Sequence, residues 1–362
     1  MIRESLNIEG IKDLQQKLSS LIGVSGYEEE VSNFIIDLIE NEGLADKSWI
    51  DPLGNVLAIK KGNDQSNRIL FDAHMDEIGF MVSHVEKKGF LRFVLIGGWD
   101  TRILLGQSVA LKSSTGKVFN GIIGSKPPHL TSVEERKKKV DVADMYIDLG
   151  LASEEEVYNN NIMIGTMGTL VSPFVEFPNG MIKGKAFDDR TGCNVLLHVL
   201  RLLKENGDVN DTALFNFAVQ EEIGGSGATT GAYTLDPTMG IAIENTTAGD
   251  VPGIRESLNP VDIGKGPAIT VADRTMISHP KINERIMKNA EIEKINYQIK
   301  KPRYGGTDAG KIHVSRKGVP SSVVSVPCRY IHSPTSLLKL QDLYETIRLV
   351  DAFLRNPASI TI

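Results

Sequence analysis

The chain has 362 residues, of which 41% are hydrophobic and 24% are charged, a balance that indicates a folded protein and excludes a mostly disordered one. Its formal net charge of -6 argues against nucleic acid as the main partner, because binding phosphates needs a concentrated basic surface. No apolar run approaches the ~20 residues of a membrane-spanning helix, so we expect no membrane partner.

The first residues carry an early acid, Glu4, and no apolar segment, so we expect no signal peptide. The chain has two cysteines, Cys193 and Cys328, far apart in the sequence. This spacing predicts neither a disulfide framework nor a cysteine zinc site. These features favour a cytoplasmic enzyme or binding protein.

Periodicity predicts helices over 11–21 and 27–41, followed by strands over 55–60 and 68–73. From about 78 to 177 the pattern changes to short strand-like runs separated by turns, with no long helix between them. Such spacing is typical of a small β domain. Within this region residues 127–144 are polar and are expected to form a mobile, solvated loop.

After residue 185 strands and helices alternate again. We predict helices over 189–206, 282–293 and 337–354, and strands over 212–217, 239–243 and 321–326. An α/β pattern on both sides of 78–177 indicates one α/β domain interrupted by an inserted, barrel-like β domain. We therefore expect residues 1–77 and 178–362 to form the two parts of a catalytic domain around an insert at 78–177.

Two adjacent carboxylates, Glu221 and Glu222, follow the apolar strand at 212–217 and precede a glycine-rich turn. Open α/β sheets bind their ligands at the carboxyl ends of strands. Neighbouring side chains on extended backbone point to opposite sides, so one of this pair would hold a cation while the other moves a proton. A solvated pair in a loop is the commoner fate of such a dipeptide, so other residues have to support this interpretation.

Further acids and histidines lie near the ends of other predicted elements: His74 with Asp76 two residues on, Asp188, Glu244 and His332. A carboxylate close to a histidine can hold the ring nitrogen that faces away from a metal, which is the role expected of Asp76. Two histidines and three carboxylates, one of them bridging, are what two zinc ions ~3.5–4 Å apart require. One carboxylate of the Glu221-Glu222 pair is then left to act as a base.

Six segments, at 21–28, 72–80, 186–190, 220–224, 305–310 and 329–334, together resemble the tetrahedral aminopeptidase family, which consists of di-metal exopeptidases of the wider zinc-peptidase clan. The family includes glutamyl and deblocking aminopeptidases. The resemblance covers nearly the whole chain in the right order. It implies a zinc-peptidase-like mixed sheet flanked by helices and interrupted by the inserted domain.

The resemblance also implies residue roles. Asp188 would bridge two divalent metal ions, with His74 and Glu244 completing one site and Glu222 and His332 the other. Glu221 would be the general base, Asp76 the partner of His74, and Asp308 would help shape the substrate pocket. Zinc is the expected metal, although cobalt and manganese accept the same ligands. Many family members have Asp where this chain has Glu244.

The implied function is a cytoplasmic, metal-dependent aminopeptidase that removes the N-terminal residue of short peptides with a water activated by two metals. The resemblance further implies a homo-oligomer, in which the inserted domain pairs subunits and six dimers close into a twelve-subunit shell. The preferred N-terminal residue depends on several loops, and the sequence leaves it open.

Three other functions remain open at this stage. An acylase or carboxypeptidase of the same clan would share the metal set. Paired carboxylates also serve glycan hydrolases, although the chain has only two tryptophans to stack on sugars. A metal-stabilised assembly protein without activity would be expected to have lost a ligand or the base, and neither is missing.

Overall fold

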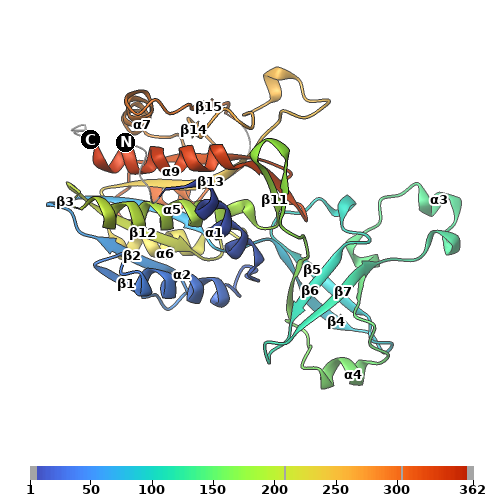
Figure 1. Cartoon of the computed structure of the whole chain (residues 1–362). Coiled ribbons are helices and arrows are strands. Elements are labelled where there is room, and N and C mark those ends of the chain that lie inside the picture. Colours follow the sequence, from blue (N-terminus) through green and yellow to red (C-terminus); the bar gives the residue numbers. More distant parts are fainter. Residues whose placement is uncertain (1–5, 208, 303–304, 357–362) are drawn as a thin grey trace.

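The computed structural model describes residues 6–207, 209–302 and 305–356, which form a large α/β lobe and a smaller β barrel beside it (Figure 1). Residues 1–5, on which the expected absence of a signal peptide rests, lie outside this part. Within it, every helix is too short or too polar to cross a bilayer. The expected fold class, a mixed sheet flanked by helices with an inserted barrel, is confirmed.

The large lobe is built on an eleven-stranded mixed sheet. Nine strands follow one another in the order β1 (Lys47–Ile50), β2 (Val56–Lys60), β12 (Asp211–Ala218), β3 (Asp64–His74), β13 (Met239–Thr247), β16 (Ser321–Arg329), β17 (Ser336–Lys339), β11 (Met181–Gly184) and β10 (Val175–Phe177). In addition, β14 (Ala268–Thr270) pairs with β16 and with β15 (Gln298–Lys300). The central strands β12, β3, β13 and β16 are mutually parallel, so their carboxyl ends meet at one edge.

Helices cover both faces of this sheet (Figure 1). On one face α1 (Ile8–Ser20), α2 (Glu29–Asn41), α5 (Phe187–Asn206), α7 (Pro280–Ile292) and α9 (Leu340–Arg355) share a single apolar core with the strands. On the other face α6 (Ser226–Leu235) and α8 (Ala309–His313) pack on a smaller core. Because both faces are covered, the central strands are buried along most of their length, which explains their nearly continuous apolar runs.

Alternation along β3 divides its side chains between the two cores. Ile69 and Phe71 point into the larger core and Leu70 into the smaller one. The Phe71 ring stacks on Phe215 of β12, with centroids 5.9 Å apart, and meets the edge of Phe353 of α9 at 6.4 Å. These contacts fix α9 against the centre of the sheet.

The barrel closes through six antiparallel strands in the order β4 (Gly79–Val85), β5 (Leu91–Ile96), β8 (Tyr146–Asp148), β7 (Val118–Gly124), β6 (Ser108–Lys112) and β9 (Met167–Leu170). It has a core of its own, in which the rings of Phe80 and Phe93 lie 5.6 Å apart. Gly168 lets β9 approach this core, since a Cβ there would lie 2.4 Å from the Phe80 ring. The division into domains at residues 77 and 177 stays a prediction. Strand β10, which ends at residue 177, pairs in the large sheet.

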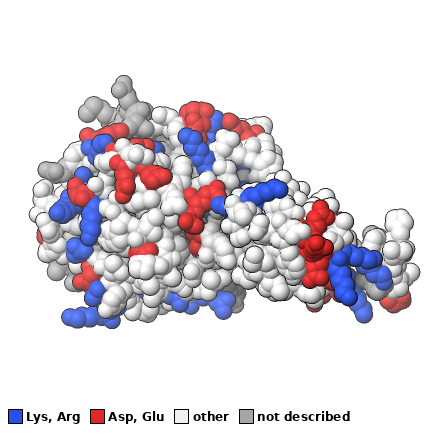
Figure 2. Space-filling model, turned by 90° about the horizontal axis from the view of Figure 1, so that it is seen from below, with Lys and Arg blue, Asp and Glu red and all other residues white. Residues whose placement is uncertain are grey.

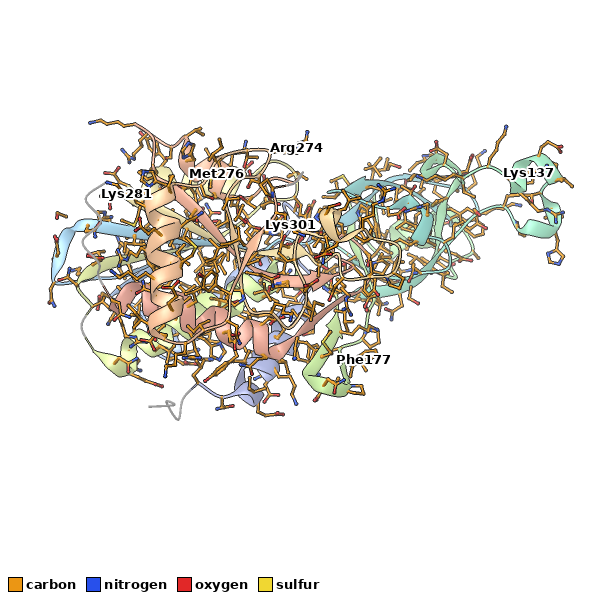
Figure 3. All side chains as sticks on the ribbon, turned by 90° about the horizontal axis from the view of Figure 1, so that it is seen from above. Lys137, Phe177, Arg274, Met276, Lys281 and Lys301 are labelled. Carbon is orange, nitrogen blue, oxygen red and sulfur yellow. The ribbon has the colours of Figure 1, made fainter. Side chains whose placement is uncertain are left out.

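The polar segment 127–144 projects from the barrel, with a short helix α3 (Val133–Arg136) near its outer end (Figure 1). Lys137 lies at the far end of this projection (Figure 3). A second short helix, α4 (Glu154–Asn159), is capped by Ser153, whose hydroxyl accepts a hydrogen bond from the Glu156 N–H. On the face shown in Figure 2, Lys and Arg are interspersed with Asp and Glu and form no broad basic surface.

Several predicted element boundaries differ from the structure, and two of these differences have a clear cause. The last helix begins at Leu340, not at 337, because residues Ser336–Lys339 pair as β17 between β16 and β11. The strand expected to end at residue 243 continues to Thr247, because β13 keeps pairing with β16 beyond Glu244, which stands opposite Ser325. Glu244 therefore lies within a strand and does not follow it.

Candidate metal centre

The parallel centre of the sheet brings the predicted acids and histidines together at one edge. His74 is the last residue of β3 and stands in register with Ala218, the last residue of β12. Glu221 and Glu222 follow in the turn after β12, and His332 follows β16. Asp188 reaches the same edge from the start of α5, where its backbone and that of Asp189 are not yet helical. All five predicted ligands line one cleft.

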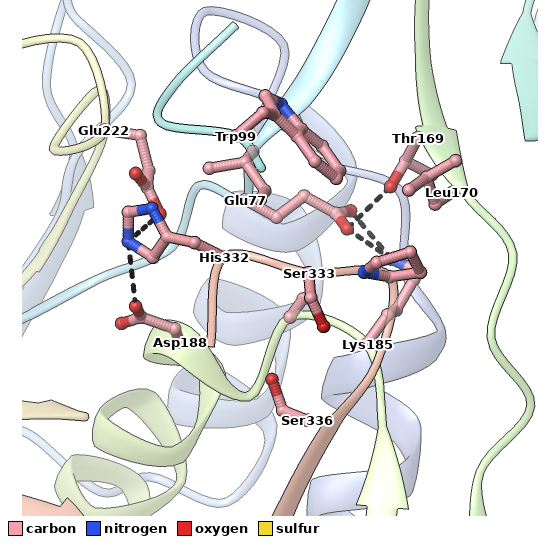
Figure 4. A pocket seen from close by; sticks show the side chains of 13 residues that line it. Glu77, Trp99, Thr169, Leu170, Lys185, Asp188, Glu222, His332, Ser333 and Ser336 are labelled. Atoms are coloured by element: carbon pink, nitrogen blue, oxygen red, sulfur yellow. Dashed lines mark hydrogen bonds and ion pairs between the residues drawn. The ribbon is translucent and has the colours of Figure 1, made fainter. Parts of the chain in front are cut away.

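Asp188 lies between the two histidines. Its Oδ1 is 3.5 Å from His74 Nε2. Its Oδ2 is 3.4 Å from His332 Nε2 (Figure 4). Each carboxylate oxygen thus faces a different imidazole nitrogen. This is the arrangement of a carboxylate that shares itself between two cations.

Each histidine also faces a glutamate. Glu244 Oε2 lies 3.9 Å from His74 Nε2, and Glu222 Oε1 lies 3.7 Å from His332 Nε2. Two ligand atoms that each lie about 2.1 Å from a tetrahedral zinc are about 3.4 Å apart, so these separations suit atoms around an ion. Three groups of donor atoms are compact enough to hold a metal: Asp188 with Glu222 and His332, His74 with Asp189 and Glu244, and His74 with Glu221 and Glu222. The donors present therefore fit two cations.

Burial disfavours the charged forms of the acidic groups in the cleft. Burial raises the pKa of Glu222 to about 8 and that of Glu244 well above its ordinary value. Contact with Asp188 raises the pKa of His332 to about 10, while Asp188 itself, despite its burial, has its pKa lowered by the two imidazoles. Carboxylates crowded into a buried cleft are costly unless cations offset their charge. The electrostatics therefore agree with the distances.

Glu221 lies in the same cleft, with its Oε2 3.9 Å from His74 Nε2. Burial raises its pKa. Its side chain keeps 20% of its surface exposed, against 4% for Glu222. The side chains of Glu221 and Glu222 thus differ in their exposure to solvent, and Glu221 is the more exposed.

Asp76 holds His74 from behind. Its Oδ1 is 3.3 Å from His74 Nδ1, and its carboxylate accepts hydrogen bonds from the backbone N–H groups of Glu221 at 2.9 Å and Glu222 at 3.1 Å. The Ser25 hydroxyl donates a fourth contact at 2.6 Å. One fully buried carboxylate therefore orients the imidazole and the turn that carries the glutamate pair.

Replacing Asp76 with Asn is expected to weaken metal binding by about 10- to 100-fold, because the side chain keeps its size but loses the charge that supports His74. Titration of the metal-free protein with zinc, followed by calorimetry, measures this change. Asp13→Asn, on the exposed side of α1, is the matched control and should bind metal normally. Unchanged affinity in Asp76→Asn would contradict a supporting role.

Sequence patterns missed a buried ion pair beside the centre. Glu77 accepts hydrogen bonds from Lys185 Nζ at 2.7 and 2.9 Å, from Thr169 Oγ1 of the barrel at 2.8 Å, and from the Gly23 N–H (Figure 4). A small cavity of about 20 Å³ lies between this pair and the ligands Asp188, Glu222 and His332. Glu77 and Lys185 are 108 residues apart, so no local spacing could have paired them.

Asp308 differs from its predicted role, and Cys193 agrees with its predicted one. Asp308, expected to shape the substrate pocket, is buried behind Glu244 and donates its backbone N–H to Glu244 Oε1 at 2.9 Å. It supports a predicted ligand and does not line the cleft, which Thr307 lines instead. Cys193 is buried under His74, whose carbonyl accepts its thiol at 3.2 Å, as expected of a core residue.

Comparison with known proteins places the site in a wider context. The profile of the M42 glutamyl aminopeptidase family matches residues 54–349. The chain is 33% identical to a lysyl aminopeptidase of Pyrococcus furiosus, over 95% of this chain and 96% of that protein. Both the glutamyl and the lysyl descriptions belong to those proteins.

Solved structures with the same fold are also similar in sequence. Aminopeptidase APDkam598 of Desulfurococcus kamchatkensis superposes with a TM-score of 0.92 at 38% identity, covering 97% of this chain and 96% of that one. The TET1 peptidase of Pyrococcus horikoshii, described as assembling into a tetrahedron or a large octahedral shell, superposes at 0.85 with 31% identity, covering 96% and 100%.

Proposed function

Because the chain belongs to the M42 glutamyl aminopeptidase family, it is a metal-dependent aminopeptidase, and we propose that two zinc ions held around Asp188 carry its chemistry. The observation that supports this proposal best is the position of Asp188, with one oxygen facing His74 and the other facing His332. Cobalt or manganese would accept the same nitrogen and oxygen ligands.

The proposed ligand assignment follows the distances. Asp188 bridges, His74 and Glu244 complete one site, and His332 and Glu222 complete the other. The side chain of Glu244 ends 3.9 Å from His74 Nε2, which supports its use as a ligand. When bound, the metals would lower the pKa of a water and polarise the scissile carbonyl.

Glu221 is proposed as the general base. Its carboxylate is the more exposed of the pair and faces the cleft, while Asp76 fixes its backbone N–H. A base in this position takes a proton from the attacking water and passes it to the leaving amine. Burial raises the pKa of Glu221, which brings the carboxylate closer to the pH at which it must both accept and release a proton.

A homo-oligomer is supported by the assembly of the TET1 relative, and we propose a closed tetrahedral shell of twelve subunits in which the barrel pairs the subunits. A shell that encloses the clefts would admit short or unfolded peptides and exclude folded proteins. The cytoplasmic location expected from the sequence remains part of this proposal.

The function predicts that a chelator abolishes hydrolysis of an aminoacyl anilide, because the cleft then holds uncompensated acids and no activated water. Zinc or cobalt added back should restore it, and an N-acetylated substrate should resist in every case. Hydrolysis that survives complete metal removal would contradict the proposal. The glycan hydrolase alternative predicts activity on a glucan, and the carboxypeptidase alternative predicts release of the C-terminal residue; family membership favours neither.

A further inference from the structure

Lys300 is the single Lys or Arg among the described residues that line the cleft of the metal ligands. It is the last residue of β15 and only 8% exposed, so its ammonium group reaches solvent through the cleft. The cleft has a volume of about 560 Å³, enough for a short peptide beside the metal centre.

The ammonium group of Lys300 makes no hydrogen bond or close ion pair with any residue in the described part of the chain. Asp273, Glu244 and Asp188 act on it electrostatically from a longer distance. Two of these acids already have partners. Asp273 accepts hydrogen bonds from the hydroxyls of Thr275 and Thr307, and Glu244 accepts the Asp308 N–H. A largely buried cation without a close counter-ion is costly unless a ligand supplies the opposite charge.

The charges in the cleft with two metal ions bound also favour an anionic ligand for Lys300. Four carboxylates line it, those of Asp188, Glu221, Glu222 and Glu244. Two divalent cations would offset these four negative charges, which leaves the charge of Lys300 in excess. A substrate group that pairs with it would therefore be an anion.

We propose that Lys300 binds a carboxylate of the substrate within the cleft. This inference rests on the aminopeptidase function proposed above. Two parts of a short peptide carry that group: the side chain of an N-terminal Glu or Asp, and the C-terminal carboxylate. If Lys300 binds the side chain of the N-terminal residue, a basic residue at that position is disfavoured, because its charge would face Lys300.

Lys300→Met, which keeps the length of the side chain and removes its charge, tests the proposal. Lys301→Met is the matched control, since Lys301 is the next residue, is exposed, and donates to the Glu256 carbonyl outside the cleft (Figure 3). One pair of substrates is the anilide of Glu against that of Gln. The other is the dipeptide Ala-Leu against its C-terminal amide.

In one of the two pairs, the wild type should have a higher kcat/KM for the substrate with the carboxylate than for its neutral counterpart. Lys300→Met should lower kcat/KM for that member by about 10- to 100-fold, mainly through KM, and change its neutral counterpart by less than about threefold. Lys300→Arg should recover most of the loss, and Lys301→Met should behave as wild type. Bound zinc should be the same in all four proteins. The pair that responds identifies which carboxylate Lys300 binds.

The proposal is overturned if both substrate ratios in Lys300→Met stay within about threefold of wild type. It is equally overturned if carboxylate and neutral substrates lose activity in parallel. Wild-type protein that hydrolyses none of the four substrates, with zinc bound, would instead overturn the aminopeptidase function itself.

Discussion

Replacing Glu221 with Gln is expected to lower kcat by about 10²- to 10⁴-fold, which is the contribution typical of a positioned general base. The amide keeps the shape of the side chain and the backbone contact to Asp76, but it cannot accept the proton of the attacking water. Bound zinc should remain at the wild-type level, since Glu221 is not one of the proposed ligands. Steady-state kinetics and elemental analysis on the same preparation measure both quantities.

The adjacent Glu222→Gln variant is a matched comparison on the same turn. Glu222 lies 3.7 Å from His332 Nε2 and is nearly buried, so its loss should reduce bound metal as well as turnover. The two variants should thus separate, with Glu221→Gln inactive and loaded and Glu222→Gln depleted of metal. Substantial turnover by Glu221→Gln, or loss of its metal, would remove it from the role of base.

Replacing Asp188 with Ala is expected to deplete both metals and to abolish measurable turnover. Its two oxygens are the groups shared between the His74 and His332 sides of the cleft, so its removal takes one ligand from each site. It also leaves the remaining carboxylates without the bridging group that would hold two cations together. Zinc affinity at both sites should fall by at least about 100-fold.

His74→Ala and His332→Ala provide the comparison for Asp188→Ala. Each removes one imidazole and should weaken mainly the site on its own side. Stoichiometric zinc titration followed by calorimetry distinguishes one lost site from two. Retention of one full zinc equivalent by Asp188→Ala would contradict a bridging role for this residue.

The elements that the sequence identified best are the buried central strands. The runs at 212–217 and 321–326 predict strands because residues covered on both faces are mostly apolar, and these segments form β12 and β16. Short strands such as β14 and β15 were missed, because three residues are too few to show a period. The start of the last helix was misplaced for a related reason: Leu338 is buried by pairing with β16 and β11, which local periodicity cannot distinguish from a helical face.

The sequence by itself predicted which residues could form the centre, because acids and histidines near the carboxyl ends of apolar strands lie at the ligand-binding edge of an open α/β sheet. It also predicted separate roles for Glu221 and Glu222 from the alternation of extended backbone. The structure places the pair in a turn, where the different exposure of the two side chains supports the same division. Only the tertiary structure decided that Asp188 lies between the two histidines, that Asp76 also holds the Glu221-Glu222 turn, and that Lys300 reaches the cleft. Those relations join residues far apart in the chain, such as Asp76 and Glu221, which are 145 residues apart. They depend on which strands pair and on what covers them, which no local pattern of side chains encodes.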